Sequence, residues 1–226
     1  MTRKLAFPWI MAPLLLSACA AHEAAPVSVS KPSFPALDAP TRLAQNEGYL
    51  PDVLAEPEQR SSYEKWFGDH LAAMKEPSWA KASPLPRGQF KLRILYLPSF
   101  APAHAVRVEK GKDWTAAVTV NGLNGRGGYA PGSRIGFEAS MLPGEEVGEL
   151  SRLMADANLA TLPFSDKSAN FICTDGMRIV FELVDDRGHH MAERHECETK
   201  GPLRILARHV DQYRKVVGAD IKYYWH

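Results

Sequence analysis

The chain has no marked excess of charge of one sign, little cysteine and no long apolar run. Its 27 lysine and arginine residues nearly balance 26 aspartate and glutamate residues, and no basic stripe is visible along it. A basic face is the usual electrostatic footprint of nucleic-acid binding, so we expect no nucleic-acid partner. The apolar run Leu5–Ala18 is shorter than the roughly twenty residues that a membrane-spanning helix needs.

The short motifs of the common hydrolases are also missing. There is no G-x-S-x-G nucleophile elbow and no H-E-x-x-H zinc motif, because His195-Glu196 is followed by no second histidine. Asp175, Asp185 and Asp186 lie in predicted turns, where aspartate is common because its side chain bonds the backbone. We therefore predict no particular catalytic residue. An enzyme with a dispersed site remains the third hypothesis, because sequence spacing does not reveal such sites.

One glycine-rich stretch, Gly125–Ala130, formally matches the G-x-G-x-x-A pattern of dinucleotide-binding loops. In such a site a helix begins at the loop, so that its first amide groups meet the pyrophosphate. Pro131-Gly132-Ser133 follows here instead. The stretch therefore favours a glycine loop, and we predict no cofactor.

The first residues have the pattern of an export signal. Arg3 and Lys4 precede the apolar run, which ends in Leu16-Ser17-Ala18-Cys19. These last four residues resemble the lipobox of bacterial lipoproteins. The resemblance implies that residues 1–18 are removed as a signal peptide and that a diacylglycerol, with fatty acids such as palmitate, is attached to Cys19. The alternative is an ordinary secretory signal in which the cysteine is incidental.

The same resemblance predicts where the protein is found. Residue 20 is alanine, not the aspartate that retains some lipoproteins at the inner membrane, so we expect an anchor in the outer membrane. The domain would then face the periplasm, and its partners would be the membrane, through the lipid on Cys19, and an envelope protein. Without the two basic residues of the leader, 25 basic and 26 acidic residues remain, a formal net charge of −1.

The three cysteines fit an oxidising compartment if Cys19 carries lipid. Cys173 and Cys197 then remain as an even pair, and we predict a disulfide between them. Closing a loop of about 24 residues would stabilise the fold by about 3 kcal/mol on the chain-entropy estimate. The alternative is two buried free thiols.

The composition divides the mature chain into two parts. Residues 19–57 are rich in alanine and proline with little periodicity, which predicts a disordered tether. Residues 58–226 are predicted to form an α+β periplasmic domain, with a helical segment over 58–82 and a core over 90–226.

The helical segment is predicted from residue spacing over Glu58–Lys75. Ser61 and Glu64 form a candidate capping box near its start. The spacing also places apolar and aromatic residues and a histidine on one face of the helix. Such an apolar face packs against its own domain more often than against a partner or lipid. Its residues are Tyr63, Trp66, Phe67, His70, Leu71 and Met74.

The core is predicted to be mostly antiparallel sheet. Helix patterns begin at Pro143 and Pro202. Met177–Val184 and His189–Glu198 predict a hairpin, in which a five-residue loop would place Leu183 opposite Met191. Further strand patterns cover 91–97, 105–108, 115–120 and 134–139.

This order of elements predicts an α+β fold in which two or three helices pack on the sheet. The arrangement of strands, a Leu-rich helix, a hairpin and a closing helix is also loosely similar to a family of uncharacterised bacterial domains. That resemblance implies no activity, because the family has none assigned.

The second hairpin strand carries the richest set of metal-ligand side chains. Imidazole, thioether and thiolate groups bind copper or zinc, so a metal-binding envelope protein using His189–Cys197 is the alternative function. Two observations count against this metal site: Met191 should also meet the core, and Cys197 is predicted to be oxidised. We therefore predict no metal site. The favoured function is a lipid-anchored binding or structural module. The residues on one face of an extended strand would be His189, Met191, Glu193, His195 and Cys197.

Overall fold

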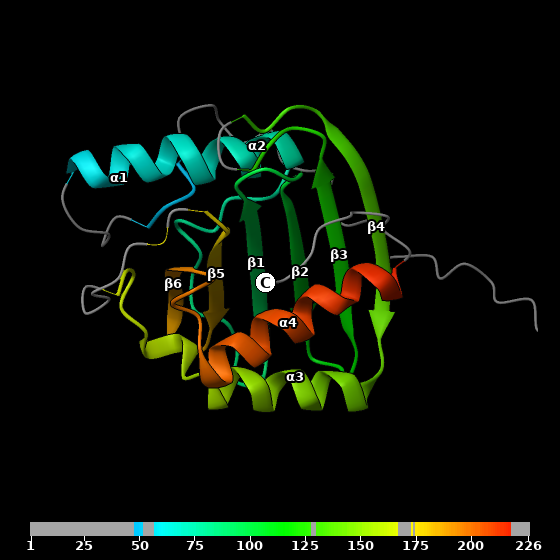
Figure 1. The fold of residues 1–226 in the computed structure, drawn as a ribbon. Helices are drawn as coiled ribbons and strands as arrows, with labels where there is room; N and C mark the ends of the chain where they lie inside the picture. Colours follow the sequence, from blue (N-terminus) through cyan, green and yellow to red (C-terminus); the bar gives the residue numbers. More distant parts are fainter. Residues whose placement is uncertain (1–47, 52–56, 128–129, 167–172, 174, 218–226) are drawn as a thin grey trace, which may run out of the picture. The chain divides into compact units, whose positions relative to one another are not determined.

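The computed structural model describes residues 48–51, 57–127, 130–166, 173 and 175–217 (Figure 1). Cys19, the rest of the lipobox and most of the predicted tether lie outside the described residues.

The described residues contain a six-stranded antiparallel sheet with the order β4-β3-β2-β1-β5-β6. The first four strands follow one another as a meander, and β5 returns to pair with the free side of β1 (Figure 1). This arrangement confirms the predicted α+β class with an antiparallel sheet. The strands are β1 (Phe90–Pro98), β2 (His104–Lys110), β3 (Ala116–Leu123), β4 (Arg134–Leu142), β5 (Met177–Asp185) and β6 (Gly188–His195).

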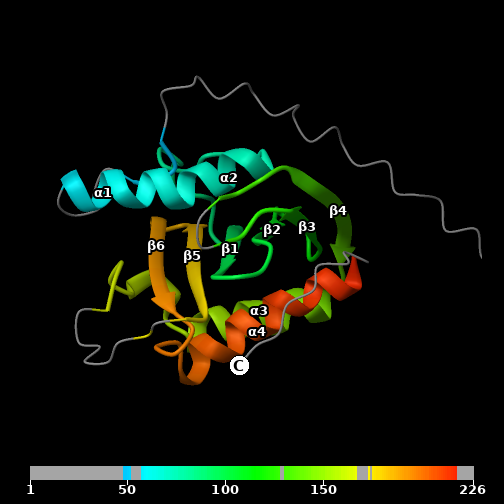
Figure 2. The same ribbon diagram turned by 45° about the horizontal axis from the view of Figure 1, so that its top comes forward.

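Helices cover both faces of the sheet (Figure 2). One face carries a continuous helical segment, in which a single π-helical stretch joins two α-helices. The opposite face carries α3 and α4, which pack against each other, and the short 3-10 helix η2 (Leu159–Thr161) follows α3. The main helices are α1 (Pro57–Tyr63), η1 (Glu64–Gly68), α2 (Asp69–Met74), α3 (Gly144–Asp156) and α4 (Gly201–Val216).

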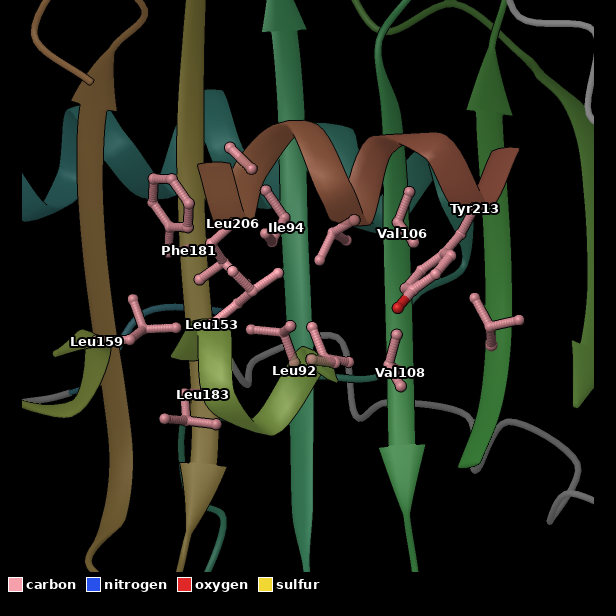
Figure 3. Packing of buried hydrophobic residues seen from close by; sticks show 14 of the residues in the cluster. Leu92, Ile94, Val106, Val108, Leu153, Leu159, Phe181, Leu183, Leu206 and Tyr213 are labelled. Carbon is pink, nitrogen blue, oxygen red and sulfur yellow. The ribbon is translucent and has the colours of Figure 1, made fainter. Parts of the chain in front are cut away.

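The larger apolar core lies between the sheet and the α3–α4 layer (Figure 3). Leu92 and Ile94 from β1 and Phe181 from β5 point into it and meet Leu206 of α4. The intervening strand residues point to the other face, where apolar side chains meet the α1–α2 segment. Coverage of both faces explains why β1 is almost continuously apolar instead of alternating, as a strand buried on both sides should be.

The predicted helical segment is present, but its capping box is wrong. The helix begins at Pro57, so Ser61 lies inside α1 and is not at its start. The Ser61 side chain is exposed. The Glu64 carboxylate accepts the backbone N–H groups of Tyr49 at 2.5 Å and Leu50 at 3.0 Å. The glutamate therefore fastens the chain that precedes the helix, and does not cap the helix start.

The predicted hairpin is also present, with a register one residue away from the predicted one. Asp185 pairs with Gly188, so the turn has two residues where five were predicted, and Leu183 lies opposite His190. The Asp185 carboxylate accepts the Arg187 N–H at 2.8 Å, and Gly188 has a φ of +117°. This turn chemistry fixes the tighter loop. Because a one-residue shift exchanges the two faces of a strand, Met191 points to the α1–α2 layer.

Candidate functional site

A buried charged pair joins the neighbouring strands β1 and β5 on the α1–α2 face of the sheet. Arg93 of β1 lies directly opposite Glu182 of β5. The Arg93 Nε donates to the Glu182 carboxylate at 2.8 Å, and its Nη2 contacts the same oxygen. Arg93 is 1% exposed and Glu182 is 2% exposed, so this is an ion pair taken out of water.

Glu76 extends the pair into a network across three strands. Lys75 ends α2 with a φ of +59°, and the buried Glu76 follows it. The Glu76 carboxylate accepts from Arg93 Nη1 at 3.4 Å, from Arg107 Nε at 2.9 Å and from the Asn121 amide. One carboxylate therefore ties β1, β2 and β3 to the end of the helical segment.

Aromatic rings and a histidine enclose this charged network. The Arg93 guanidinium lies 4.4 Å from the centroid of the Trp79 ring and 6.0 Å from that of Tyr49. The Tyr49 hydroxyl donates to the Glu76 carbonyl oxygen at 2.9 Å. On the other side, His189 Nε2 lies 2.9 Å from the second Glu182 oxygen. A cation between desolvated aromatic faces is stabilised by about 2 kcal/mol.

The electrostatics keep both members of the central pair charged. Burial alone would raise the pKa of Glu182, but Arg93 and His189 hold it below its ordinary value. Burial alone would lower the pKa of Arg93, but Glu182 and Glu76 raise it overall. A carboxylate and a guanidinium locked in these states do not exchange protons near neutral pH. The network is therefore suited to holding the helical segment on the sheet.

The structure separates the five candidate metal-ligand residues of the alternative function. His189 contacts Glu182 at one end of β6, and Met191 packs in the apolar cluster under the helical segment. Glu193 accepts from Arg178 at 2.8 Å. His195 ends the strand and Cys197 lies in the following turn. The five side chains therefore do not converge on one point.

The far end of β6 holds the two cysteines of the domain. Cys173 and Cys197 are joined in a disulfide with their Cα atoms 6.6 Å apart. His195 Nδ1 lies 3.0 Å from Cys197 Sγ and accepts the Cys197 backbone N–H at 3.3 Å. Burial, followed by the charge of Arg178, lowers the pKa of His195. Gly176 makes room for the imidazole, because a Cβ there would lie 2.9 Å from His195 Cε1.

A second buried histidine lies on the opposite face of the sheet. His104 of β2 stacks on Tyr96, with ring centroids 4.6 Å apart, and its Nε2 lies 2.9 Å from the Asp211 carboxylate of α4. Asp211 also accepts from Arg214 Nε at 2.7 Å. Burial lowers the pKa of His104; Asp211 opposes this shift, and Arg214 adds to it.

This lowered pKa predicts acid sensitivity. As pH falls through about 6.5, the unfolded chain gains a proton at residue 104 that the folded chain does not, so the free energy of unfolding decreases. We expect His104→Gln to reduce the stability loss between about pH 7.5 and about pH 5.5 by about 1 kcal/mol, measured by urea unfolding at both pH values. An unchanged loss in the variant would show that His104 is protonated equally in both states.

The glycine-rich stretch does not open a helix. Gly125 donates its N–H to Pro131 O at 3.1 Å, Arg126 pairs with Ala130, and β4 follows. A Cβ on Gly127 would lie 2.6 Å from Pro98 O, so this glycine allows a close backbone approach. Residues 128 and 129 of the motif lie outside the described residues. The helix-terminal amides that a dinucleotide site needs are not formed by the described part of this loop.

Comparison with known proteins adds no assignment: no protein-family model matches the chain, and no curated protein is detectably similar to it. Within the described part of the chain, no helix is long and apolar enough to cross a membrane.

Proposed function

We propose that this protein is a lipid-anchored component of the bacterial cell envelope whose folded domain acts as a binding or structural module. The observation that carries the proposal is the pairing of the cysteines. The chain has three, and the disulfide uses Cys173 and Cys197. The remaining one is Cys19, which stands at the lipobox position. A disulfide also fits an exported protein, because cytosolic thiols are kept reduced.

The charged network supports a binding or structural role over catalysis. Arg93 donates to both Glu76 and Glu182 inside the domain, and burial leaves these three residues at most 2% exposed. Groups held in this way strengthen the attachment of the helical segment to the sheet. An exported module of this kind would meet a protein partner in the envelope, held near the membrane by its lipid.

The anchor is tested by replacing its cysteine. We expect Cys19→Ser to abolish incorporation of a labelled fatty acid, because the substitution removes the sulfur that carries the lipid. The measurement is metabolic labelling followed by immunoprecipitation, with density fractionation to show that the wild-type label lies in the outer membrane. The double variant C173S/C197S is the matched control and should keep its label. Label retained by Cys19→Ser would overturn the proposed anchor.

A further inference from the structure

The disulfide end of β6 brings together three groups that bind thiophilic metal ions. The sulfurs of Cys173 and Cys197 and a ring nitrogen of His195 all lie within 4.8 Å of one another. We propose that reduction of the disulfide turns this cluster into a binding site for Zn²⁺. The site shares only His195 and Cys197 with the strand-face set of the alternative function, and it goes beyond the proposed envelope role.

The nitrogen of the site is in the unprotonated form that coordination requires, and a metal would take the place of the hydrogen bond that it now accepts. His195 Nδ1 accepts a hydrogen bond from the Cys197 backbone N–H at 3.3 Å, so it carries a lone pair and not a proton. The same nitrogen lies 3.0 Å from Cys197 Sγ. A neutral imidazole with its lone pair beside a sulfur is the ligand form that zinc requires.

The spacing of the cysteines allows a metal between their sulfurs. Their Cα atoms are 6.6 Å apart, near the upper end of the range that a disulfide tolerates. Two thiolates bound to one zinc at about 2.3 Å each lie within about 4.6 Å of each other, so rotation of the Cys173 and Cys197 side chains would suffice. Cysteine sulfurs and an imidazole are three of the four ligands of a tetrahedral zinc site.

Neighbouring groups hold the histidine and the turn in place without a metal. The backbone N–H of His195 donates to the Glu198 carboxylate at 2.9 Å, and the Thr199 hydroxyl donates to the His195 carbonyl at 2.9 Å. Gly176, which has a φ of +122°, leaves space for the ring edge. Ligands fixed in this way lose little freedom on binding, which favours affinity.

Formation of the site needs a dithiol reductant in the envelope. Thiol–disulfide exchange transfers two electrons and two protons to the Cys173–Cys197 bond, and the reductant leaves as its own disulfide. Zinc then displaces the two thiol protons as the two Zn–S bonds form. The oxidised chain, in which both sulfurs are joined to each other, offers His195 alone. Metal uptake is therefore controlled by the redox state of one bond.

The proposal is tested by zinc titration of the full chain in detergent. Every sample carries C19S, so that only two thiols can bind and lipidation does not enter. We expect the chain reduced with a phosphine to bind one Zn²⁺ in competition with a chromophoric chelator, and the oxidised chain to bind none. C173S and H195N should weaken binding at least about tenfold, since each removes one ligand. The control H190N removes a histidine from the opposite face of β6 and should bind as the parent does.

Cobalt supplies an independent signature. Co²⁺ bound to the reduced chain should give thiolate charge-transfer absorption together with the visible bands of a tetrahedral ion, and H195N should lose or shift those bands. Circular dichroism follows the fold of each sample. Should reduction unfold the chain, zinc is expected to restore the folded spectrum. Absence of that recovery, or zinc binding equal in the reduced chain and in C173S/C197S, would overturn the proposal.

Discussion

Replacing Glu76 with glutamine is expected to lower the free energy of unfolding by about 3–5 kcal/mol, the range for breaking a buried ion pair. The neutral side chain keeps the shape of glutamate but leaves Arg93 and Arg107 without the carboxylate that both now contact. Both guanidinium groups are largely removed from water, so solvent does not replace the lost partner. Urea unfolding of the variant and the parent at neutral pH measures the difference.

The matched control is Glu138→Gln on β4, which removes the same charge from an exposed side chain. We expect this control to change stability by less than about 0.5 kcal/mol. Equal effects of the two substitutions would mean that the buried network contributes nothing specific. Faster amide hydrogen exchange over residues 57–74 in Glu76→Gln would show that the lost stability comes from weaker attachment of the helical segment to the sheet.

Local patterns were sufficient to predict most of the elements. Alternation of apolar and polar residues over Met177–Val184 gave β5, and the spacing of apolar residues after Pro143 and Pro202 gave α3 and α4. Each of these patterns reflects one buried face, which is a property of neighbouring residues. The antiparallel fold class followed from their order.

The errors arose where one local signal competed with another. Asp185-Asp186-Arg187-Gly188 indicated a turn correctly, but the loop length depended on the Asp185 side chain bonding the Arg187 N–H. This bond and the positive φ of Gly188 favour the two-residue turn, and the register of that turn places Met191 on the other face. In the same way, Ser61 and Glu64 have the spacing of a capping box, although the helix begins before both.

The charged network could not be predicted from sequence because its members are distant along the chain. Arg93 and Glu182 are 89 residues apart and meet only because β5 returns to the free side of β1. Alternation of polar and apolar residues is typical of a strand with one solvent-exposed face, so it does not by itself indicate a buried charged network. The helical segment covers that face, so the same polar positions became a buried network. The pairing of Cys173 with Cys197 was predicted without such information, because the predicted lipid attachment to Cys19 leaves only these two cysteines.

The largest effect in the apolar core is expected at Phe181. This ring of β5 is fully buried between the sheet and the α3–α4 layer, where it lies in the cluster that contains Leu206 (Figure 3). Phe181→Ala should lower the free energy of unfolding by about 3–5 kcal/mol, because it removes a buried aromatic ring and leaves a cavity between the sheet and the α3–α4 layer. Phe100→Ala is the matched control; its ring is 68% exposed, and its removal should cost less than about 0.5 kcal/mol. Equal losses in urea unfolding would contradict the packing of β5 under α4, because only a buried ring can leave a cavity.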